Sequence, residues 1–395
     1  MVRKLLVLAN TLYSFGGGER YALELAQRLK RHADITVVFP VSGSSPRKIT
    51  KEDMEKRFDV KGVRLVELPC VGIKADIPGV GRFLMMIPKP TGSSRFKELV
   101  KDSDVVYAIS TNPFMLRSAI RLSRRYHKRF ILGLHNPEIV KARGKPEGVM
   151  QAMVLKVQGV MEKRLLNSIE HIHVQTESQL GNLEKTTYKG KVYYMPHFLY
   201  FAPESKDLKV GNKDFEILFV ARFSIHQKGL DLFKEIVEKA LAKNSNLKFK
   251  IIGTGDKDGE QIVKGLVAKY PDNITWKGFV TEDELRAQYL DSALYVLPSR
   301  YETPGLTLLE AQSYGLPAVA FNVPGPKDIM RNKKQGVLAV PFDTSEFARG
   351  IMYYYQLFIR NKTAYRELKV AINGIIRKRY NEDMTIKKFA AMIND

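Results

Sequence analysis

The sequence predicts an α/β protein with two doubly wound parallel sheets, one in each half of the chain. In both halves, short apolar runs typical of buried parallel strands alternate with amphipathic stretches of helical periodicity. The 395 residues exceed what one ordinary hydrophobic core supports, so two domains are expected. Residues 196–212 lose this periodicity and contain Pro203, Gly211 and several charges, as a linker does.

These observations divide the chain into four expected parts. They are an N-terminal Rossmann-like domain at residues 1–197, a linker at 198–212, a C-terminal Rossmann-like domain at 213–380, and a last helix at 381–395 that packs back on the N-terminal domain. Ligands of such sheets bind at the carboxyl ends of the strands. Two such domains facing each other would place a ligand site in the cleft between them.

The N-terminal half begins with an apolar strand at residues 5–9, followed by a glycine loop and a helix to Lys30. Gly16 and Gly17 in this loop would let the backbone approach a pyrophosphate, and a flexible turn is the alternative interpretation. No GxGxxG or GKS/GKT motif accompanies the loop, so neither a dinucleotide cofactor nor a P-loop NTPase is indicated.

His135 directly follows an expected strand at residues 130–134, and so stands at a carboxyl strand end. It is either a residue that handles a sugar or a proton, or a histidine that satisfies loop carbonyls. His171 and His173 alternate within a strand, where a structural role is favoured. Further strands are expected at 35–39, 63–68, 105–109, 171–174 and 192–195, and helices at 114–126 and 149–166.

The C-terminal half repeats the alternation. Strands are expected at 215–220, 247–252, 274–276, 293–297 and 318–321, with helices that begin at Leu230, Gly259, Glu282 and Thr303. Two of the strand ends carry residues suited to a nucleotide, namely Gly253 in a glycine turn and Lys277 beside Trp276. Each of these is a weak signal by itself.

The stretch PSRYETPGLTLLEAQSYGLPAVA, residues 298–320, predicts a strand end, a loop and a helix N-terminus. Thr303 is suited to cap the helix and Pro304 to take its first position. The free amides of Gly305, Leu306 and Thr307 would then form an anion site, reinforced by the helix dipole.

Two glutamates flank this anion site. Glu302 precedes it, and Glu310 lies three residues after Thr307, on the helix face that the free amides begin. Carboxylates at these positions are suited to bind sugar hydroxyls on either side of a phosphate. The alternative is a solvated loop acid and a surface helix residue, because short spacings also match by chance.

A strand also delivers Arg222 to a loop, with Lys228 six residues later. Two converging cations neutralise a diphosphate, most effectively as negative charge develops on a leaving group. The alternative is a pair of solvated surface cations.

Composition sets further limits. The net charge of +22 is concentrated in the first 197 residues, which hold 34 basic and 18 acidic residues, so this half is the one expected to meet an anionic partner. Cys70 is the single cysteine, which points to a reducing compartment. No apolar run is long enough to span a membrane, and no zinc-type spacing or DxD-like cluster is present, so no metal site is expected.

These motifs occur together in one order: GGGER, VAR followed by KG, GTG, KGFV and ETPGLTLLEAQSYGLPAVA. In this the chain resembles the retaining nucleotide-sugar glycosyltransferases of family 4, which have the GT-B fold. Residues 217–338 are the specific part of the resemblance, whereas residues 42–101 match no motif. The sequence departs from the family at Thr303-Pro304, where the common motif is EGFG, and at Pro324-Gly325-Pro326.

The resemblance implies roles for the residues above. Glu302 would contact the donor sugar and Glu310 the ribose, whereas Arg222 and Lys228 would hold the diphosphate with the amides of residues 305–307. Gly16 and Gly17 would close on the phosphates from the other domain, and His135 would lie beside the sugar. The family implies a UDP- or GDP-linked sugar donor, no cofactor or metal, and retention at the anomeric carbon.

The acceptor is expected to be a lipid or a lipid-linked glycan. Arg117, Arg121, Arg124 and Arg125 fall along one side of an expected helix, and residues 82–89 form an apolar segment nearby. A basic face beside an exposed apolar segment suits an anionic membrane, and a solvated outer helix face is the alternative. We therefore expect a cytoplasmic enzyme with peripheral attachment to the membrane.

Other classes of protein share some of these features. A sugar-nucleotide epimerase or a phosphorylase would keep the fold and change the chemistry. A basic nucleic-acid-binding protein would also explain the charge, but the sequence contains no known binding module and no aromatic platform pattern, so no nucleic acid is expected.

Overall fold

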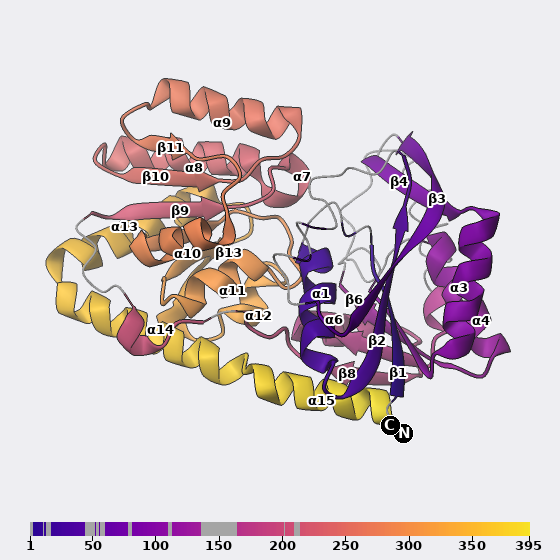
Figure 1. Cartoon of the computed structure of the whole chain (residues 1–395). Coiled ribbons are helices and arrows are strands. Elements are labelled where there is room, and N and C mark those ends of the chain that lie inside the picture. The colour runs from indigo at the N-terminus through magenta and orange to yellow at the C-terminus, as the bar shows by residue number, and fades with distance from the viewer. Residues whose placement is uncertain are drawn as a thin grey trace. The chain divides into compact units, whose positions relative to one another are not determined.

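The computed structural model describes residues 3–10, 12, 17–43, 52, 55, 60–77, 81–109, 113–135, 164–200, 202–208 and 214–395. These residues form two compact units (Figure 1). The N-terminal unit comprises Met1–Pro196 and Asp383–Asp395, and the C-terminal unit comprises His197–Glu382.

The N-terminal unit is built on an eight-stranded sheet with the order β4-β3-β2-β1-β5-β6-β7-β8. All neighbouring strands are parallel except β3 and β4, which pair antiparallel. The strands are β1 (Arg3–Leu8), β2 (Ala33–Val41), β3 (Val63–Ile77), β4 (Gly81–Pro88), β5 (Val105–Ala108), β6 (Arg129–Leu134), β7 (His171–Val174) and β8 (Lys191–Tyr194).

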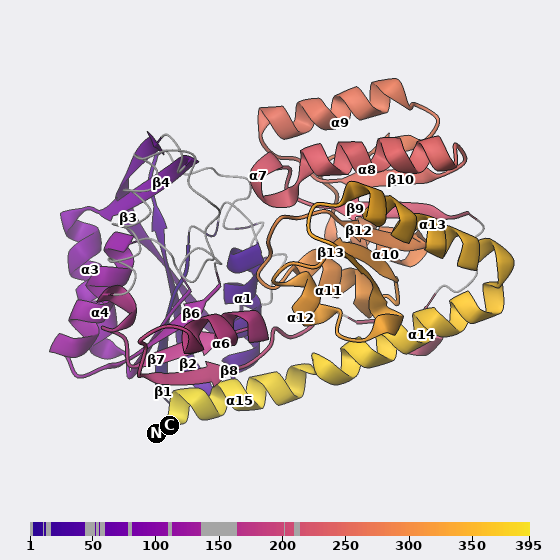
Figure 2. The ribbon, with the colours of Figure 1, turned by 180° about the vertical axis from the view of Figure 1, so that it is seen from behind.

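Helices cover both faces of this sheet, as Figures 1 and 2 show from opposite sides. α3 (Pro90–Asp102), α4 (Pro113–Arg125) and α6 (Glu177–Glu184) pack on one face through a common apolar core with alternate strand residues. On the other face, α1 (Gly17–Leu29) supplies Tyr21, and α15 (Glu382–Asn394) supplies Phe389, whose ring lies against Tyr107 of β5. Crossover helices on both faces confirm the predicted doubly wound sheet.

The β3–β4 ribbon was not predicted from the sequence. The first part of β3, Val63–Pro69, pairs with β2, and the second part, Cys70–Ile77, leaves β2 and pairs with β4. The apolar segment at residues 82–89 therefore forms most of an edge strand, although the side chains of residues 82–85 lie outside the described part of the structure. Most of the helix predicted at 149–166 lies outside the described residues, which resume at residue 164.

The C-terminal unit has a six-stranded, fully parallel sheet with the order β11-β10-β9-β12-β13-β14. α8 (Leu230–Lys243), α9 (Lys257–Lys269) and α13 (Thr344–Arg360) pack on one face, and α10 (Glu282–Asp291), α11 (Leu306–Ser313) and α14 (Lys362–Arg379) pack on the other. The strands are β9 (Glu216–Val220), β10 (Lys248–Ile252), β11 (Ile274–Trp276), β12 (Leu294–Leu297), β13 (Ala318–Phe321) and β14 (Gly336–Ala339).

Candidate functional site

The candidate site lies at the carboxyl ends of β9 and β12, which are neighbours in the C-terminal sheet. The chain leaves β9 for helix α8 on one face and leaves β12 for helix α11 on the other, so this is a topological switch point, where open α/β sheets bind their ligands. The loop after β9 contains Arg222 and Lys228. The loop after β12 contains Ser299, Arg300 and Glu302.

Glu302 is a buried carboxylate, and one of its oxygens receives two hydrogen bonds. The Lys228 ammonium donates to Oε1 over 2.6 Å, and the Ser299 hydroxyl donates to the same atom over 2.7 Å. Only 5% of Glu302 is exposed to solvent. In the described residues, the Lys228 and Ser299 donors both bind Oε1. Oε2 is therefore the oxygen suited to accept from a ligand hydroxyl.

Lys228 is the last residue of α7 (Ile225–Lys228), a single helical turn that the Ser224 side chain caps. Gly229 ends this turn at φ 66°, in the left-handed region that glycine tolerates best. A Cβ atom at residue 229 would collide with the carbonyl oxygen of Pro298. The glycine therefore allows the turn with Lys228 to lie directly against the start of the loop after β12.

Arg300 joins the two loops by several hydrogen bonds. Its backbone amide donates to the Gln227 carbonyl over 2.9 Å, and its guanidinium donates to the Ile225 carbonyl over 2.7 Å. The guanidinium also donates to both carboxylate oxygens of Asp231, over 2.8 and 2.6 Å. These hydrogen bonds lower the pKa of Asp231 below its ordinary value and fix the turn that positions Lys228.

The helix after Glu302 begins later than predicted. α11 starts at Leu306, and its N-cap is Gly305 at φ 100°, with no capping hydrogen bond from a side chain. The expectations that Thr303 caps the helix and that Pro304 is its first residue are therefore wrong, because helical geometry begins only after Gly305. The Thr303–Pro304 peptide bond is cis.

The predicted amide donors agree with this later start. The first amides of a helix have no acceptor within it, and Leu306 and Thr307 are the first two residues of α11. Their N–H groups, at the positive end of the helix dipole, suit a phosphate.

Glu310, one helical turn further along α11, is held by a tyrosine of a neighbouring helix. The Tyr289 hydroxyl of α10 donates to Glu310 Oε2 over 3.0 Å. Tyr295 of β12 donates to the Thr307 hydroxyl oxygen over 2.7 Å, and burial raises the pKa of Tyr295 well above its ordinary value, so it remains a protonated donor. Two tyrosines thus fix the polar side chains at the start of α11.

The other predicted residues of the C-terminal unit follow three different strands. Arg222 and Lys277 are exposed. Gly253 follows β10, and a Cβ atom there would collide with the carbonyl oxygen of Ala221, so this glycine allows the chain after β10 to approach the chain after β9. The structure explains Gly253 by packing, and its contact with a nucleotide stays a prediction.

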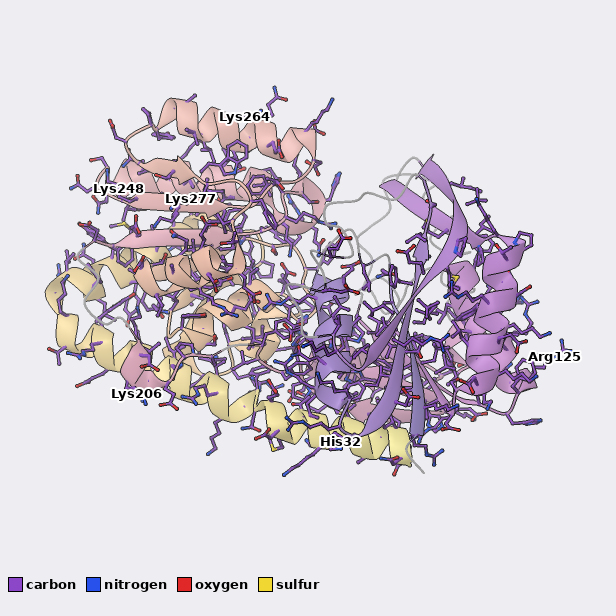
Figure 3. The ribbon with its side chains drawn as sticks, in the orientation of Figure 1. His32, Arg125, Lys206, Lys248, Lys264 and Lys277 are labelled. Carbon is purple, nitrogen blue, oxygen red and sulfur yellow. The ribbon has the colours of Figure 1, made fainter. Side chains whose placement is uncertain are left out.

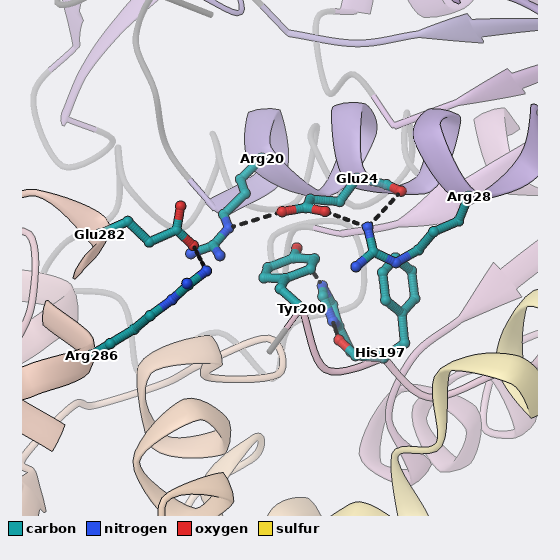
Figure 4. Close-up of polar contacts among 8 residues, drawn as sticks. Arg20, Glu24, Arg28, His197, Tyr200, Glu282 and Arg286 are labelled. Carbon is teal, nitrogen blue, oxygen red and sulfur yellow. Dashed lines mark hydrogen bonds and ion pairs between the residues drawn. The ribbon is translucent and has the colours of Figure 1, made fainter. Parts of the chain in front are cut away.

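Gly16 lies outside the described residues, and Gly17 is the first residue of α1. Glu24 of this helix forms ion pairs with Arg20, over 3.6 Å, and with Arg28 (Figure 4). Pairs four residues apart stabilise a helix, so these contacts support the helix that follows the glycine loop.

His135 lies at the end of β6, as predicted, and its Nε2 atom is 2.8 Å from the Tyr107 hydroxyl. The structure thus brings Lys228, Glu302 and the start of α11 together within the C-terminal unit, and it places Gly17 and His135 in the N-terminal unit. The expected meeting of the two groups of residues stays a prediction.

Sequence reasoning missed Ser299, Arg300 and Tyr289. Ser299 and Arg300 directly follow an apolar strand, which is a signal that could have identified them. Tyr289 lies within a helix and gives no such signal, because its role depends on how α10 packs against α11.

The described residues contain neither a metal-binding cluster nor a membrane-spanning helix. In this part of the chain, no group of three or more His, Cys, Asp or Glu side chains could hold a metal ion. No helix in the same residues is long and apolar enough to cross a membrane.

Comparison with known proteins gives matches to part of the chain. Residues 201–366 match the family described as glycosyl transferases group 1. A 162-residue segment is 33% identical to an uncharacterized 41.2 kDa protein in the cps region of Klebsiella pneumoniae, and covers 40% of this chain and 42% of that protein. A 146-residue segment is 32% identical to an uncharacterized glycosyltransferase of Methanocaldococcus jannaschii, and covers 36% of each chain. The chain thus spans less than half the length of these curated relatives.

Comparison of structures extends over the whole chain. The structure of HepE from Anabaena in complex with UDP and glucose superposes with a TM-score of 0.73 at 14% identity, covering 100% of both chains. The fold is GT-B. A GT-B protein contains two Rossmann-like domains, in agreement with the two doubly wound sheets described above.

Proposed function

We propose that this GT-B protein is a retaining, metal-independent glycosyltransferase of family 4, which transfers a sugar from a nucleotide-diphosphate donor to a lipid or lipid-linked glycan. The observation that carries the proposal is the convergence of Lys228, Glu302 and the first amides of α11 at one switch point. A cation and amide donors suit a diphosphate, and a carboxylate suits sugar hydroxyls. All of these groups lie within residues 201–366, which match group 1 glycosyl transferases.

Each group would bind one part of the donor. Glu302 accepts from the sugar hydroxyls, Glu310 accepts from the ribose, and the amides of Leu306 and Thr307 bind the diphosphate together with Arg222 and Lys228. The structural neighbour HepE is described with UDP and glucose, which supports UDP-glucose as the first donor to test. GDP-linked sugars are the second class.

Transfer with retention needs no protein nucleophile in this proposal. The bond between the anomeric carbon and the phosphate oxygen breaks while the acceptor oxygen bonds to the same face of that carbon, and the acceptor proton passes to the leaving phosphate. Arg222 and Lys228 stabilise the charge that develops on the phosphate, as a divalent cation would. The proposal therefore expects full activity in excess EDTA and an α-linked product from UDP-glucose.

A basic surface of the N-terminal unit supports a membrane-bound acceptor. Arg117, Arg121, Arg124 and Arg125 of α4 are exposed, and Arg125 projects outward in Figure 3. Phe114 at the start of this helix is 39% exposed. Cationic side chains beside exposed apolar side chains bind anionic lipid surfaces, by charge attraction and by burial of the apolar groups.

The ribbon of β3 and β4 carries further exposed apolar side chains. Val71 and Ile73 alternate along β3, so they share one face of the strand, and they are 49% and 42% exposed. We infer that the protein works in the cytoplasm, attached peripherally to an anionic membrane through α4 and this ribbon.

The donor is tested with a thermal-shift panel of UDP-, GDP- and ADP-linked sugars on the parent protein and on Glu302→Ala. We expect one UDP- or GDP-sugar to raise the melting temperature of the parent and to have a weaker effect on Glu302→Ala. If no nucleotide sugar stabilises the parent, the proposal fails. Product analysis with a labelled donor then separates transfer from epimerisation, which needs no acceptor, and from phosphorolysis, which needs phosphate.

The membrane is tested by sedimentation with phosphatidylglycerol vesicles at low and moderate salt. We expect binding that weakens with salt and is lost in the double variant Arg121→Glu, Arg125→Glu. The double variant Lys248→Glu, Lys264→Glu, which makes the same change of charge on two exposed lysines of the C-terminal unit, is the matched control and should bind like the parent. Absence of binding at low salt would refute the membrane part and leave the donor chemistry standing.

A further inference from the structure

We propose that Tyr107 and His173 fix His135 in the tautomer that has its proton on Nε2, so that Nδ1 is the acceptor nitrogen of the His135 ring. Tyr107 and His173 are thus positioning residues. The expected effect on sugar transfer rests on the proposed function, whereas the tautomer does not.

Three hydrogen bonds connect His135 to the interior of the N-terminal unit. His135 Nε2 lies 2.8 Å from the Tyr107 hydroxyl, and the same hydroxyl lies 2.8 Å from His173 Nδ1. His173 Nε2 lies 3.1 Å from the Met195 carbonyl oxygen. This chain of hydrogen bonds therefore ends at a backbone carbonyl, which can only accept.

The position of every proton follows from that carbonyl. His173 must donate from Nε2 to Met195, and a neutral ring then has Nδ1 as an acceptor. Tyr107 must donate its single proton to this Nδ1, so its oxygen can only accept from its other two partners, Tyr21 and His135. His135 therefore donates from Nε2, and the acceptor nitrogen of its neutral ring is Nδ1.

Burial keeps Tyr107 and His173 neutral, so the directions of these hydrogen bonds do not change. Tyr107 is 0% and His173 is 1% exposed, and the Phe389 ring lies 5.2 Å from each of their rings. Burial lowers the pKa of His173 to about 4 and raises that of Tyr107, so both groups are neutral near pH 7. The Tyr21 ring lies 4.4 Å from the His135 ring and restricts its rotation.

Gly133 provides the space for the bond between Tyr107 and His135. A Cβ atom at this position would collide with the Tyr107 hydroxyl and would lie 2.8 Å from His135 Nε2. Even an alanine would therefore push the two groups apart. The absence of a side chain at residue 133 is thus a second observation, independent of the hydrogen bonds, that the contact is built into the sheet.

The tautomer is tested directly by nitrogen NMR of histidine-labelled protein at pH 8, with His135→Gln to assign the His135 signals. We expect the Nε2–H tautomer in the parent. Tyr107→Phe removes only the hydroxyl and should produce a mixture of tautomers at His135. Tyr193→Phe, a tyrosine of β8 in the same sheet, is the matched control and should leave the His135 signals unchanged.

Kinetics tests the role of the tautomer in transfer. Tyr107→Phe should lower kcat/KM about tenfold, the cost of one lost hydrogen bond. The same substitution should have no further effect in a His135→Gln background, because its effect acts through His135. A separate effect in that background would show a merely structural role.

Two results would overturn the inference: an Nδ1–H tautomer in the parent, or an unchanged tautomer in Tyr107→Phe. Because the NMR measurement needs no substrate, it remains informative if no nucleotide sugar binds. A protein with the expected tautomer but without donor binding would refute the proposed function alone.

Discussion

Lys228 and Glu302, 74 positions apart in the sequence, form a 2.6 Å ion pair in which both side chains are largely shielded from water. The resemblance assigns Lys228 to the diphosphate and Glu302 to the sugar, yet without ligand each is the partner of the other. Arrival of a donor would therefore give the cation a second anion and leave Glu302 Oε2 to accept from a hydroxyl. The pair aligns both groups before the donor binds.

Loss of the Lys228 ammonium should mainly lower turnover. We expect Lys228→Ala to reduce kcat about 100-fold, because the leaving phosphate loses a cation that acts most strongly in the transition state. The variant should also unfold more easily by about 2 kcal/mol, since Glu302 keeps only one donor. Steady-state kinetics and urea unfolding check the two effects, and Lys228→Ala combined with Glu302→Gln should recover stability but not turnover. Equal turnover in Lys228→Ala would remove its leaving-group role.

Removal of the Tyr289 hydroxyl should weaken nucleotide binding. In Tyr289→Phe, Glu310 loses the donor that orients it, and we expect the Kd for the free nucleotide diphosphate to rise about fivefold. Tyr314→Phe is the matched control, because this ring stacks on Tyr289 at 5.4 Å and receives the same change. Calorimetric titration decides the question, and equal affinities of the two variants would contradict the assigned role of Tyr289.

Substitution of Gly325 should disturb the loop that holds Glu302. Gly325 has φ 92°, and a Cβ atom there would lie 2.6 Å from Glu302 Cβ and 2.8 Å from the Pro304 carbonyl oxygen. We expect Gly325→Ala to destabilise the protein by about 2 kcal/mol or more and to lower activity. Gly265→Ala on α9 meets nothing within 4 Å and should stabilise by about 0.5–1 kcal/mol. Thermal denaturation compares the two, and a neutral Gly325→Ala would show that the loop relaxes freely.

His173 should make stability depend on pH between about 4 and 6.5. Its pKa is about 4 in the folded protein, whereas an unfolded histidine has its ordinary value of 6.5, so in this range the unfolded chain binds more protons. The free energy of unfolding should therefore decrease as pH falls from 6.5 to 4, by about 3 kcal/mol from this residue.

The comparison that isolates His173 is with His173→Gln, which does not titrate. Urea unfolding at several pH values should give a smaller slope for the variant, while the carboxylates contribute equally to both proteins. Identical slopes would show that His173 is not kept neutral by burial.

The repeating pattern of strands and helices was predictable because apolar runs report burial directly. The runs at residues 5–9 and 293–297 correspond to buried strands at the centres of the two sheets. The β3–β4 ribbon was not predictable, because its pairing is antiparallel and its exposed residues, such as Ile73, do not mark a core. The helix start near Thr303 was misplaced because capping preferences suggested Thr303, whereas the positive φ of Gly305 sets the boundary.

The sequence indicated site residues only where they belong to a motif that comes after a strand. Lys228 and Glu302 lie in the segments that follow β9 and β12, and His135 directly follows β6. The hydrogen-bond partners of the site residues, Ser299, Tyr289 and Tyr107, were not predictable. Each contact depends on how the chain folds, which the local sequence does not show. His173 was expected to be structural, and its hydrogen bonds show how a structural residue can set the state of a neighbour.

The position of Phe389 has a consequence for how the protein is made. Its ring packs on Tyr107 and His173, which are separated from it in the chain by the whole C-terminal unit. During synthesis, the N-terminal sheet emerges from the ribosome long before this phenylalanine, so its aromatic cluster remains incomplete until some two hundred further residues have been translated. The C-terminal unit, whose residues are contiguous, can fold first even though it is synthesised second.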